Sequence, residues 1–233
     1  MTIALRLAAV QARVAAACDR AGRPVAEVAI IAVSKTHPAD AVRAAYAAGA
    51  TDFGENYAQE LAAKAAELAA APPPAVAGTG PLRWHFIGRL QRNKAKLVAG
   101  RVALVHAVDT IELAEELARR AGGVTQPILL GVNLAGEATK GGVTAEAAPD
   151  LARAVAGVTG ISLDGLMTMP PPSDDPEASR PHFDGLRALR DRLVDQLGRP
   201  LPILSMGMSH DFEIAIAAGA THVRVGTAIF GSR

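Results

Sequence analysis

The sequence predicts an α/β protein, a single (β/α)8 barrel with one additional helix at its N-terminus. Short apolar segments alternate with alanine-rich helical segments eight times along the 233 residues, a pattern typical of βαβ units and a parallel sheet. The length is close to the roughly 250 residues of a typical barrel of this kind. No G-x-G-x-x-G or Walker motif follows the first predicted strand, so an open doubly wound sheet lacks its main signature.

The first element is an amphipathic helix over residues 3–20, which ends near the Gly22-Arg23-Pro24 segment. Its apolar residues recur at helical spacing: Ile3, Leu7, Val10, Val14 and Cys18. This helix precedes the first strand and therefore lies outside the eight repeating units.

The eight repeats follow in order, and the whole chain, residues 1–233, is predicted to form one domain. The predicted strands are 28–35, 50–56, 83–88, 102–109, 127–133, 161–168, 202–208 and 221–227. The predicted helices are 38–48, 56–70, 110–121, 144–156, 181–197 and 210–218, with a shorter helix at 90–99. The proline-rich stretches 71–81 and 170–176 are predicted to be long loops, because the alternation continues across both.

Composition and charge exclude several classes of protein. A hydrophobic content of 50 % with a net charge of +1 is typical of a globular domain and unlike a dedicated nucleic-acid-binding or membrane-surface protein. The single cysteine, Cys18, excludes an intramolecular disulfide and a cysteine-built metal site. No apolar run reaches membrane-spanning length, and Arg6 and Arg13 interrupt the N-terminal apolar pattern, unlike a signal peptide. We therefore expect a cytoplasmic location.

Two basic side chains are predicted to point into the barrel where its strands end. Lys35 shares a strand face with Val33, and Arg224 lies opposite Val223 and Val225, which suit the helix-covered outside. The first and last strands are neighbours in a closed barrel, and binding sites gather at the carboxyl ends of its strands. A buried arginine is costly unless acceptors or an anion meet it. The pair therefore predicts an anionic ligand.

The ends of the seventh and eighth strands predict a phosphate site, as in other barrels of this kind. The strands end in LSMGMS and RVGT, and Ser209 is predicted to cap the helix at 210–218. Glycines there allow close backbone approach, and side-chain hydroxyls accompany them: Gly207, Gly226, Gly231, Ser205 and Thr227. An inward lysine beside a phosphate site indicates a Schiff base with a carbonyl phosphate. A sugar phosphate and pyridoxal 5′-phosphate both remain candidates at this point.

The assembled motifs resemble the pyridoxal phosphate homeostasis protein family over nearly the whole chain. They are AVSKTHPA, DFGENYAQE, WHFIGRLQRNK, GLMTMPPP, LSMGMSHDFEIAIAAGATHVRVGTAIFG and, more loosely, NLAGEATKGGV. The resemblance implies a barrel similar to the N-terminal domain of alanine racemase, which is the type III fold of pyridoxal phosphate proteins. It implies pyridoxal 5′-phosphate as cofactor and a role in vitamin B6 homeostasis inside the cell.

The resemblance also implies roles for individual residues, all in cofactor binding and none in catalysis or metal binding. Lys35 would form the Schiff base, and Arg224 would lie beside the pyridine nitrogen. The phosphate and the ring-hydroxyl side would fall to Ser205, the Met206 backbone, Gly226, Thr227 and Asn56. The protein would then yield its cofactor to pyridoxal-phosphate-dependent apo-enzymes.

Simpler interpretations compete at several positions. Arg224 is a candidate for an ion pair with Asp52 or Glu55, and Asn56 for a helix cap. His85 is more readily a satisfied core histidine than a catalyst. The basic residues of segment 89–96 are predicted to be a solvated face rather than a nucleic-acid site, because aromatic residues make up only 3 % of the chain. Lys140 is a second amine that could capture the cofactor, or simply a loop lysine.

Two enzymatic functions compete with a carrier. A racemase needs acid–base groups on both faces of its substrate, and racemases take the second from a further domain that is not visible in this sequence. Tyr57 is the one tyrosine predicted near the site, since Tyr46 falls within a helix. An aldolase would need a carboxylate pair around Lys35 and would leave Arg224 without a role. The sequence therefore favours a monomeric, non-catalytic carrier, with a racemase-like enzyme as the alternative.

Overall fold

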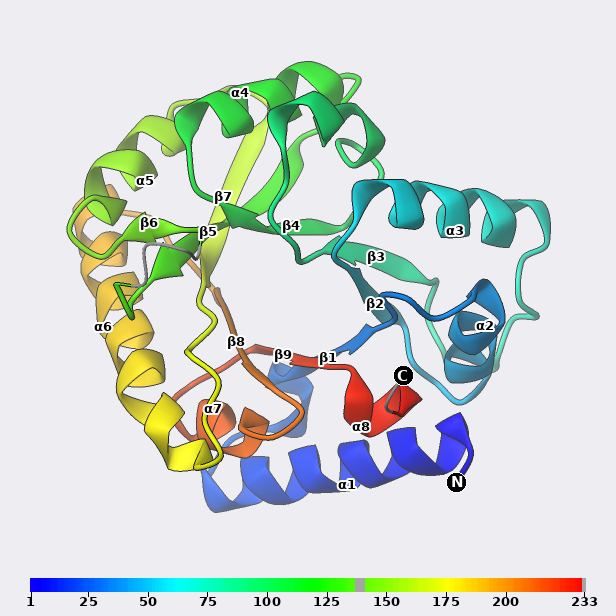
Figure 1. Ribbon diagram of the computed structural model, residues 1–233. Helices are drawn as coiled ribbons and strands as arrows, with labels where there is room; N and C mark the ends of the chain where they lie inside the picture. The colour runs from blue at the N-terminus through cyan, green and yellow to red at the C-terminus, as the bar shows by residue number, and fades with distance from the viewer. Residues whose placement is uncertain (137–140, 232–233) are drawn as a thin grey trace.

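Eight parallel strands close into a barrel in the computed structural model, which describes residues 1–136 and 141–231 (Figure 1). They are β1 (Ala29–Val33), β2 (Asp52–Glu55), β3 (Arg83–Phe86), β4 (Leu104–Val108), β5 (Gln126–Asn133), β7 (Ile161–Met167), β8 (Ile203–Met208) and β9 (His222–Val225). Each strand pairs with the next of these in the chain, and β9 pairs with β1 to close the ring. The predicted barrel is confirmed.

Helices cover the outside of the barrel, where the outward side chains of the strands form the main core (Figure 1). The α-helices are α1 (Ile3–Arg20), α2 (Ala39–Ala47), α3 (Ala58–Ala70), α4 (Ile111–Arg120), α5 (Ala148–Ala156), α6 (Arg180–Leu197), α7 (Phe212–Ala217) and α8 (Thr227–Phe230). Three short 3₁₀ helices are η1 (Val25–Glu27), η2 (Arg92–Leu97) and η3 (Pro176–Ser179). In the described residues no helix is long and apolar enough to span a membrane.

The additional N-terminal helix is confirmed, and it packs against the last elements of the chain. Helix α1 contacts α7 and α8 along its length (Figure 1). Its buried face contains Leu7, Val10, Val14 and Cys18, as the helical spacing predicts. Helix α8 directly follows β9, so α1 packs against the segment that continues from the last strand of the barrel.

Segment 90–99 contains a short helix, as predicted, the 3₁₀ helix η2. Two other predicted features differ from the structure. The helix predicted from residue 144 begins at Ala148, because β6 (Val143–Thr144) pairs with β5 outside the ring. Ser209 does not cap α7; Asp211 holds that position. The two proline-rich stretches are loops, as predicted.

Candidate functional site

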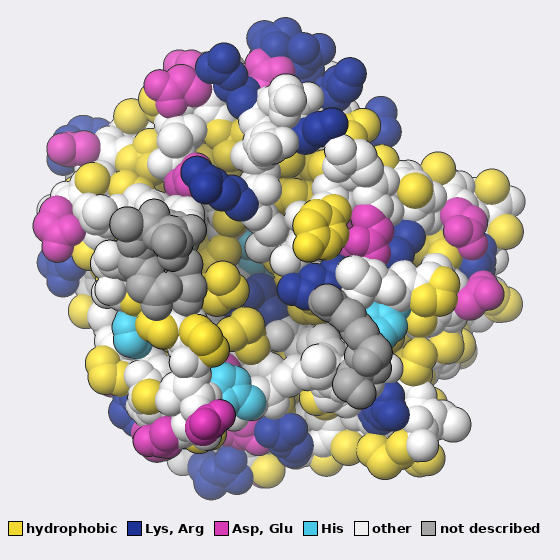
Figure 2. All heavy atoms as spheres, in the orientation of Figure 1, with side chains coloured by type: hydrophobic (Ala, Val, Ile, Leu, Met, Phe, Trp, Pro, Cys, Tyr) yellow, Lys and Arg dark blue, Asp and Glu magenta, His cyan; other side chains and the backbone are white. Residues whose placement is uncertain are grey.

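A cavity of about 600 Å³ opens at the carboxyl ends of the strands. Figure 2 shows that this face of the molecule is hollowed near its centre, with lysine or arginine side chains visible inside. Every strand of the ring, or the segment directly after it, contributes to the wall. Representative residues are Val33, Asn56, Gly88, Ala107, Gly131, Met167, Met208 and Arg224.

Lys35 lines this cavity from the turn that follows β1. The next residue, Thr36, has a φ of 65°, the left-handed conformation that a threonine rarely adopts. Asn56 lines the same side of the cavity from the neighbouring strand end. Its Oδ1 is buried and accepts no hydrogen bond from any described group.

Arg224 lines the base of the cavity and is only 5 % exposed. Its Nη1 donates to Ser205 Oγ at 2.7 Å, and its Nη2 donates to the Thr168 carbonyl at 2.9 Å. Burial lowers the pKa of Arg224 to about 10, so the guanidinium stays protonated at neutral pH. The site therefore has a fixed, partly desolvated positive charge.

Beneath Arg224, a chain of hydrogen bonds crosses the barrel interior. Ser205 Oγ lies 2.8 Å from His106 Nδ1, and His106 Nε2 lies 3.0 Å from His85 Nδ1. His85 Nε2 lies 2.8 Å from Asp52 Oδ1. Complete burial lowers the pKa of His106 well below its usual value, with the nearby positive groups adding to the effect. This chain fixes the Ser205 hydroxyl as an acceptor for Arg224.

The other end of the chain is a buried carboxylate. Burial raises the pKa of Asp52, but hydrogen bonds from His85, Arg83 and Thr51 outweigh that effect and hold the pKa well below its usual range. Asp52 Oδ2 accepts from Arg83 at 2.8 Å. Asp52 is thus occupied by Arg83 and His85, and Glu55 forms its ion pair with Lys64, so neither is the partner of Arg224.

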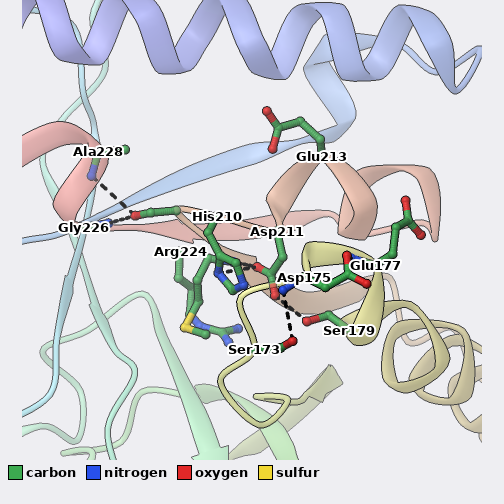
Figure 3. A network of polar contacts seen from close by, with 12 residues as sticks. Ser173, Asp175, Glu177, Ser179, His210, Asp211, Glu213, Arg224, Gly226 and Ala228 are labelled. Carbon is green, nitrogen blue, oxygen red and sulfur yellow. Dashed lines mark hydrogen bonds and ion pairs between the residues drawn. The ribbon is translucent and has the colours of Figure 1, made fainter.

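The loops after β8 and β9 form a cradle of backbone N–H groups at one side of the cavity. Ser209 Oγ accepts from Gly226 N at 3.2 Å and from Ala228 N at 3.5 Å (Figure 3). Ser209, Gly226 and Thr227 all line the cavity. A hydroxyl and N–H donors grouped in this way are suited to an anion such as phosphate.

The two acidic residues near this cradle are engaged elsewhere. Asp211, only 1 % exposed, accepts from Met208 N at 2.6 Å and from Ser179 Oγ at 2.8 Å. Glu213 forms an ion pair with Arg13 of α1 at 2.7 Å. Figure 3 shows Asp211 turned toward Ser179 and Glu213 turned away from Arg224. These contacts offset the negative charge that would otherwise oppose an anion here.

Comparisons with known proteins agree with this geometry. A sequence model described as "Alanine racemase, N-terminal domain" matches residues 5–233. The pyridoxal phosphate homeostasis protein of Aquifex aeolicus is 44 % identical to the chain, over 98 % of this chain and 97 % of the relative. The protein of the same name from Pseudomonas aeruginosa is 47 % identical, over 100 % of this chain and 96 % of the relative. The chain belongs to the pyridoxal phosphate homeostasis protein family.

Solved structures extend the similarity. PipY of Synechococcus elongatus, solved with pyridoxal phosphate (PLP) bound, is 36 % identical with a TM-score of 0.82, covering 99 % of this chain and 100 % of PipY. Alanine racemase of Corynebacterium glutamicum is 18 % identical with a TM-score of 0.65, covering 97 % of this chain and 62 % of the racemase. The second likeness shows the fold alone.

In this homeostasis-family member, the structure brings most of the predicted site residues together. Lys35, Asn56, Arg224, Gly226 and Thr227 all line the one cavity. Their assignment to a cofactor stays a prediction, but their common location agrees with it. His85 is a hydrogen-bonded core histidine, as expected.

Ser205 and Met206 do not line the cavity. Both are fully buried, and the Ser205 hydroxyl contacts Arg224 and His106 below the cavity floor. Side chains alternate along β8, and the bend at Gly207, with a φ of 90°, brings the later residues Met208 and Ser209 to the cavity instead. Ser209, which lines the cavity, is therefore a further candidate for the contact that the sequence predicts for Ser205.

Sequence reasoning missed several residues that the structure places around the site. Ser209 was interpreted as a helix cap, and no pattern distinguished His106 or Thr168 from ordinary strand residues. Lys64 left a detectable signal, because it occupies a core-facing position of α3 between Leu61 and Leu68. Lys140 lies outside the described residues. Among those described, no group of three or more His, Cys, Asp or Glu residues could hold a metal ion.

Proposed function

We propose that this protein binds pyridoxal 5′-phosphate in the barrel cavity, holds it as a Schiff base on Lys35 and yields it to other proteins. The observation that carries the proposal is that Lys35, Arg224 and the cradle formed by the loops after β8 and β9 line one cavity. An amine, a fixed cation and an anion cradle together match an aldehyde that also carries a pyridine ring and a phosphate. PipY, solved with PLP bound, supports the same choice of ligand.

The residues present fit this cofactor. The Ser209 hydroxyl and the N–H groups of Gly226 and Ala228 would receive the phosphate, with Thr227 beside them. Arg224 would donate a hydrogen bond to the pyridine nitrogen and leave that nitrogen unprotonated. Asn56, which lines the cavity, would lie on the ring-hydroxyl side. Ser205 would act through Arg224 rather than on the phosphate.

The same arrangement favours a carrier over an enzyme. When bound, the cofactor supplies an electron sink, and that sink is weaker with a neutral ring than with a protonated one. The pKa of Arg224, lowered by burial only to about 10, stays well above neutral pH, so the guanidinium keeps its protons and leaves the ring nitrogen unprotonated. We infer a cytoplasmic, monomeric protein that donates its cofactor to PLP-dependent apo-enzymes.

A racemase-like activity is the second candidate, because a carboxylate and an imidazole also line the cavity: Asp109 and His210. Either could exchange a proton with a bound amino acid. Tyr57, the tyrosine that the sequence pointed to, is 58 % exposed and lies outside the cavity wall. Asp109 already accepts from Gly142 N at 3.2 Å. The racemase reading therefore depends on groups other than that tyrosine.

The covalent bond is tested by borohydride reduction of the loaded protein, followed by peptide mass mapping. We expect the reduced adduct on Lys35 and its loss in Lys35→Ala. Lys96→Met, which removes an exposed lysine, is the matched control and should leave the adduct unchanged. An adduct only on Lys94, Lys96 or Lys140 would contradict the proposed site.

The carrier role needs a separate test with two measurements. Loaded protein is mixed with an apo-form PLP enzyme, and recovery of that enzyme's activity is compared with the rate expected from free cofactor. L- and D-amino acids are then incubated with the loaded protein in deuterated water and examined for exchange at the α-carbon. Transfer without exchange supports a carrier. Saturable exchange that is lost in Asp109→Asn or His210→Gln would make the protein an enzyme.

A further inference from the structure

Lys64 is a buried lysine of α3 whose side chain is only 8 % exposed. Its Nζ lies 2.7 Å from each of three acceptors: the Ser34 carbonyl, Glu55 Oε1 and Glu60 Oε1. An ammonium has three N–H donors, so all of them are used. Burying a charge is costly unless it is paired in this way, and such a cluster has a defined geometry.

The acceptors of Lys64 hold the backbone on both sides of Lys35. Ser34 directly precedes Lys35; its carbonyl accepts from Lys64, and its hydroxyl donates to Glu55 Oε1 at 2.7 Å. Thr36 directly follows Lys35, and its backbone N–H donates to Glu60 Oε1. The turn that presents Lys35 is therefore fixed at both of its neighbours by one connected group of side chains.

The same turn is strained. Thr36 has a φ of 65°, and among the described non-glycine residues it alone has a positive φ. Such a conformation persists only where the surrounding structure stabilises it. Two hydrogen bonds do so here: Glu60 holds the N–H of Thr36, and the Thr36 hydroxyl donates to the Lys35 carbonyl at 2.6 Å. Without Glu60 and Lys64 the turn would relax toward commoner conformations.

None of Lys64, Glu55 and Glu60 lines the cavity, so they cannot act on a ligand directly. We propose that Lys64 is a positioning residue for Lys35: through Ser34 and Glu60 it holds the turn so that the Lys35 amine meets the cofactor aldehyde. The inference rests on the proposed function. In that step Lys35 Nζ adds to the aldehyde carbon, a C=N bond forms and one water leaves; release of the cofactor takes the water back.

The proposal predicts that covalent capture and simple binding can be separated. Most of the cavity wall is built from other strand ends, and the hydrogen bonds of Lys64 go to Ser34, Glu55 and Glu60, none of which lines the cavity. Loss of Lys64 should therefore weaken the Schiff base while leaving non-covalent binding almost intact. A purely structural role for Lys64 would affect both kinds of binding together.

The test compares two ligands with Lys64→Met in the full-length protein. One ligand is pyridoxal 5′-phosphate; the other is 4′-deoxypyridoxine 5′-phosphate, which lacks the aldehyde and cannot react with Lys35. We expect the adduct-forming equilibrium with pyridoxal 5′-phosphate to fall by roughly tenfold, as for loss of one charge-assisted hydrogen bond. Affinity for the deoxy analogue should change by less than about twofold. Lys96→Met, in which an exposed lysine is removed, should match the wild type for both ligands.

A second variant keeps the proposal testable if Lys64→Met does not fold. Glu60 is 23 % exposed in its side chain, so Glu60→Ala removes the Thr36 contact with less cost to the core. It should show the same separation between the two ligands, to a smaller degree. An equal loss for both ligands, or no loss for either, in the folded variant would overturn the proposal.

The adduct measured in the Lys35, Lys64 and Glu60 variants distinguishes a wrong positioning role for Lys64 from a wrong assignment of Lys35. If Lys35→Ala abolishes the adduct but Lys64→Met and Glu60→Ala leave it unchanged, the proposed function stands and the positioning role is wrong. If the adduct persists in Lys35→Ala, the assignment of Lys35 itself fails. Trapping with borohydride and mass mapping reports these outcomes without any measurement of catalysis.

Discussion

Ser205 and Ser209 belong to the same strand-to-loop segment, yet they face different partners. Ser205 is buried against Arg224 and His106, whereas Ser209 lies at the cavity beside Gly226 and Ala228. A strand alternates its side chains, and the left-handed bend at Gly207 then changes the direction of the chain. Ser205 and Ser209 therefore have different hydrogen-bond partners although they are only four residues apart.

Alanine substitutions should separate the roles of the two serines. We expect Ser209→Ala to weaken the binding of pyridoxal 5′-phosphate by roughly 1.5–3 kcal/mol, since a hydrogen bond to a charged phosphate is lost. The binding of unphosphorylated pyridoxal should hardly change. Ser205→Ala should weaken both ligands equally, because Arg224 loses a support beneath the ring. Equilibrium binding of the two ligands to each variant measures the difference. A phosphate-selective loss in Ser205→Ala instead would return the phosphate to the site predicted from the sequence.

His222, a half-buried histidine of β9, should make stability depend on pH. Burial lowers the pKa of His222 to about 4. The unfolded value is about 6.5, so below that pH the unfolded chain takes up a proton that folded His222 does not. The contribution to stability is therefore complete above about pH 6.5 and decreases as the pH falls toward 4.

Urea unfolding at pH 7 and pH 4 tests this dependence. Relative to His222→Gln, the wild type should lose roughly 2–4 kcal/mol more of its free energy of unfolding over that range. His210→Gln is the control, since the His210 side chain is 41 % exposed on the cavity rim. Identical pH dependences in the wild type and His222→Gln would show that His222 is not buried in its neutral form.

Among the secondary-structure elements, the ends of β2 and β3 approach so closely that only glycine fits between them. A Cβ on Gly88 would lie 2.2 Å from the carbonyl oxygen of Asn56. The obstacle is backbone, so a side-chain rotation cannot relieve it. The close approach is what keeps Asn56 at the cavity wall beside Lys35.

Gly88→Ala should therefore be damaging in two ways. We expect a loss of at least about 2 kcal/mol in the free energy of unfolding, together with weaker cofactor binding as Asn56 is displaced. Gly80→Ala is the matched control, because no atom lies within 4 Å of its ideal Cβ position. Chemical denaturation and ligand titration of both variants report the effect. Equal stabilities for the two variants would contradict the close approach.

At the scale of the whole molecule, barrel closure joins residues that are far apart in the sequence. The β1–β9 pairing places Ile31 beside Arg224, and Lys35 and Arg224 consequently share one cavity. The strands also carry a polar chain, in which Asp52, His85 and His106 are linked, and a small apolar cluster of Leu104, Leu129 and Met167. Helix α1 closes the outside by packing on α7 and α8.

The sequence alone determined the barrel and its additional helix, and it predicted five residues that line one cavity. Strand ends in a parallel barrel all point to one face, so a chemical group at the end of a recognisable strand can be located from periodicity alone. That logic placed Lys35, Arg224, Gly226 and Thr227 correctly at the cavity, and Asn56 with them. Its weak point was the end of β8, where the bend at Gly207 interrupts the alternation.

Only the tertiary structure decided which groups hold those residues in place. The bend at Gly207 decides that Ser209 lines the cavity and Ser205 does not. The link from Asp52 to Arg224 crosses several strands, and the Lys64 cluster joins a helix to the turn after β1. Such contacts depend on side-chain direction and on distances between segments remote in sequence. The periodicity of a sequence shows which face of a strand or helix a residue occupies. It does not show which residue of a remote segment that side chain contacts.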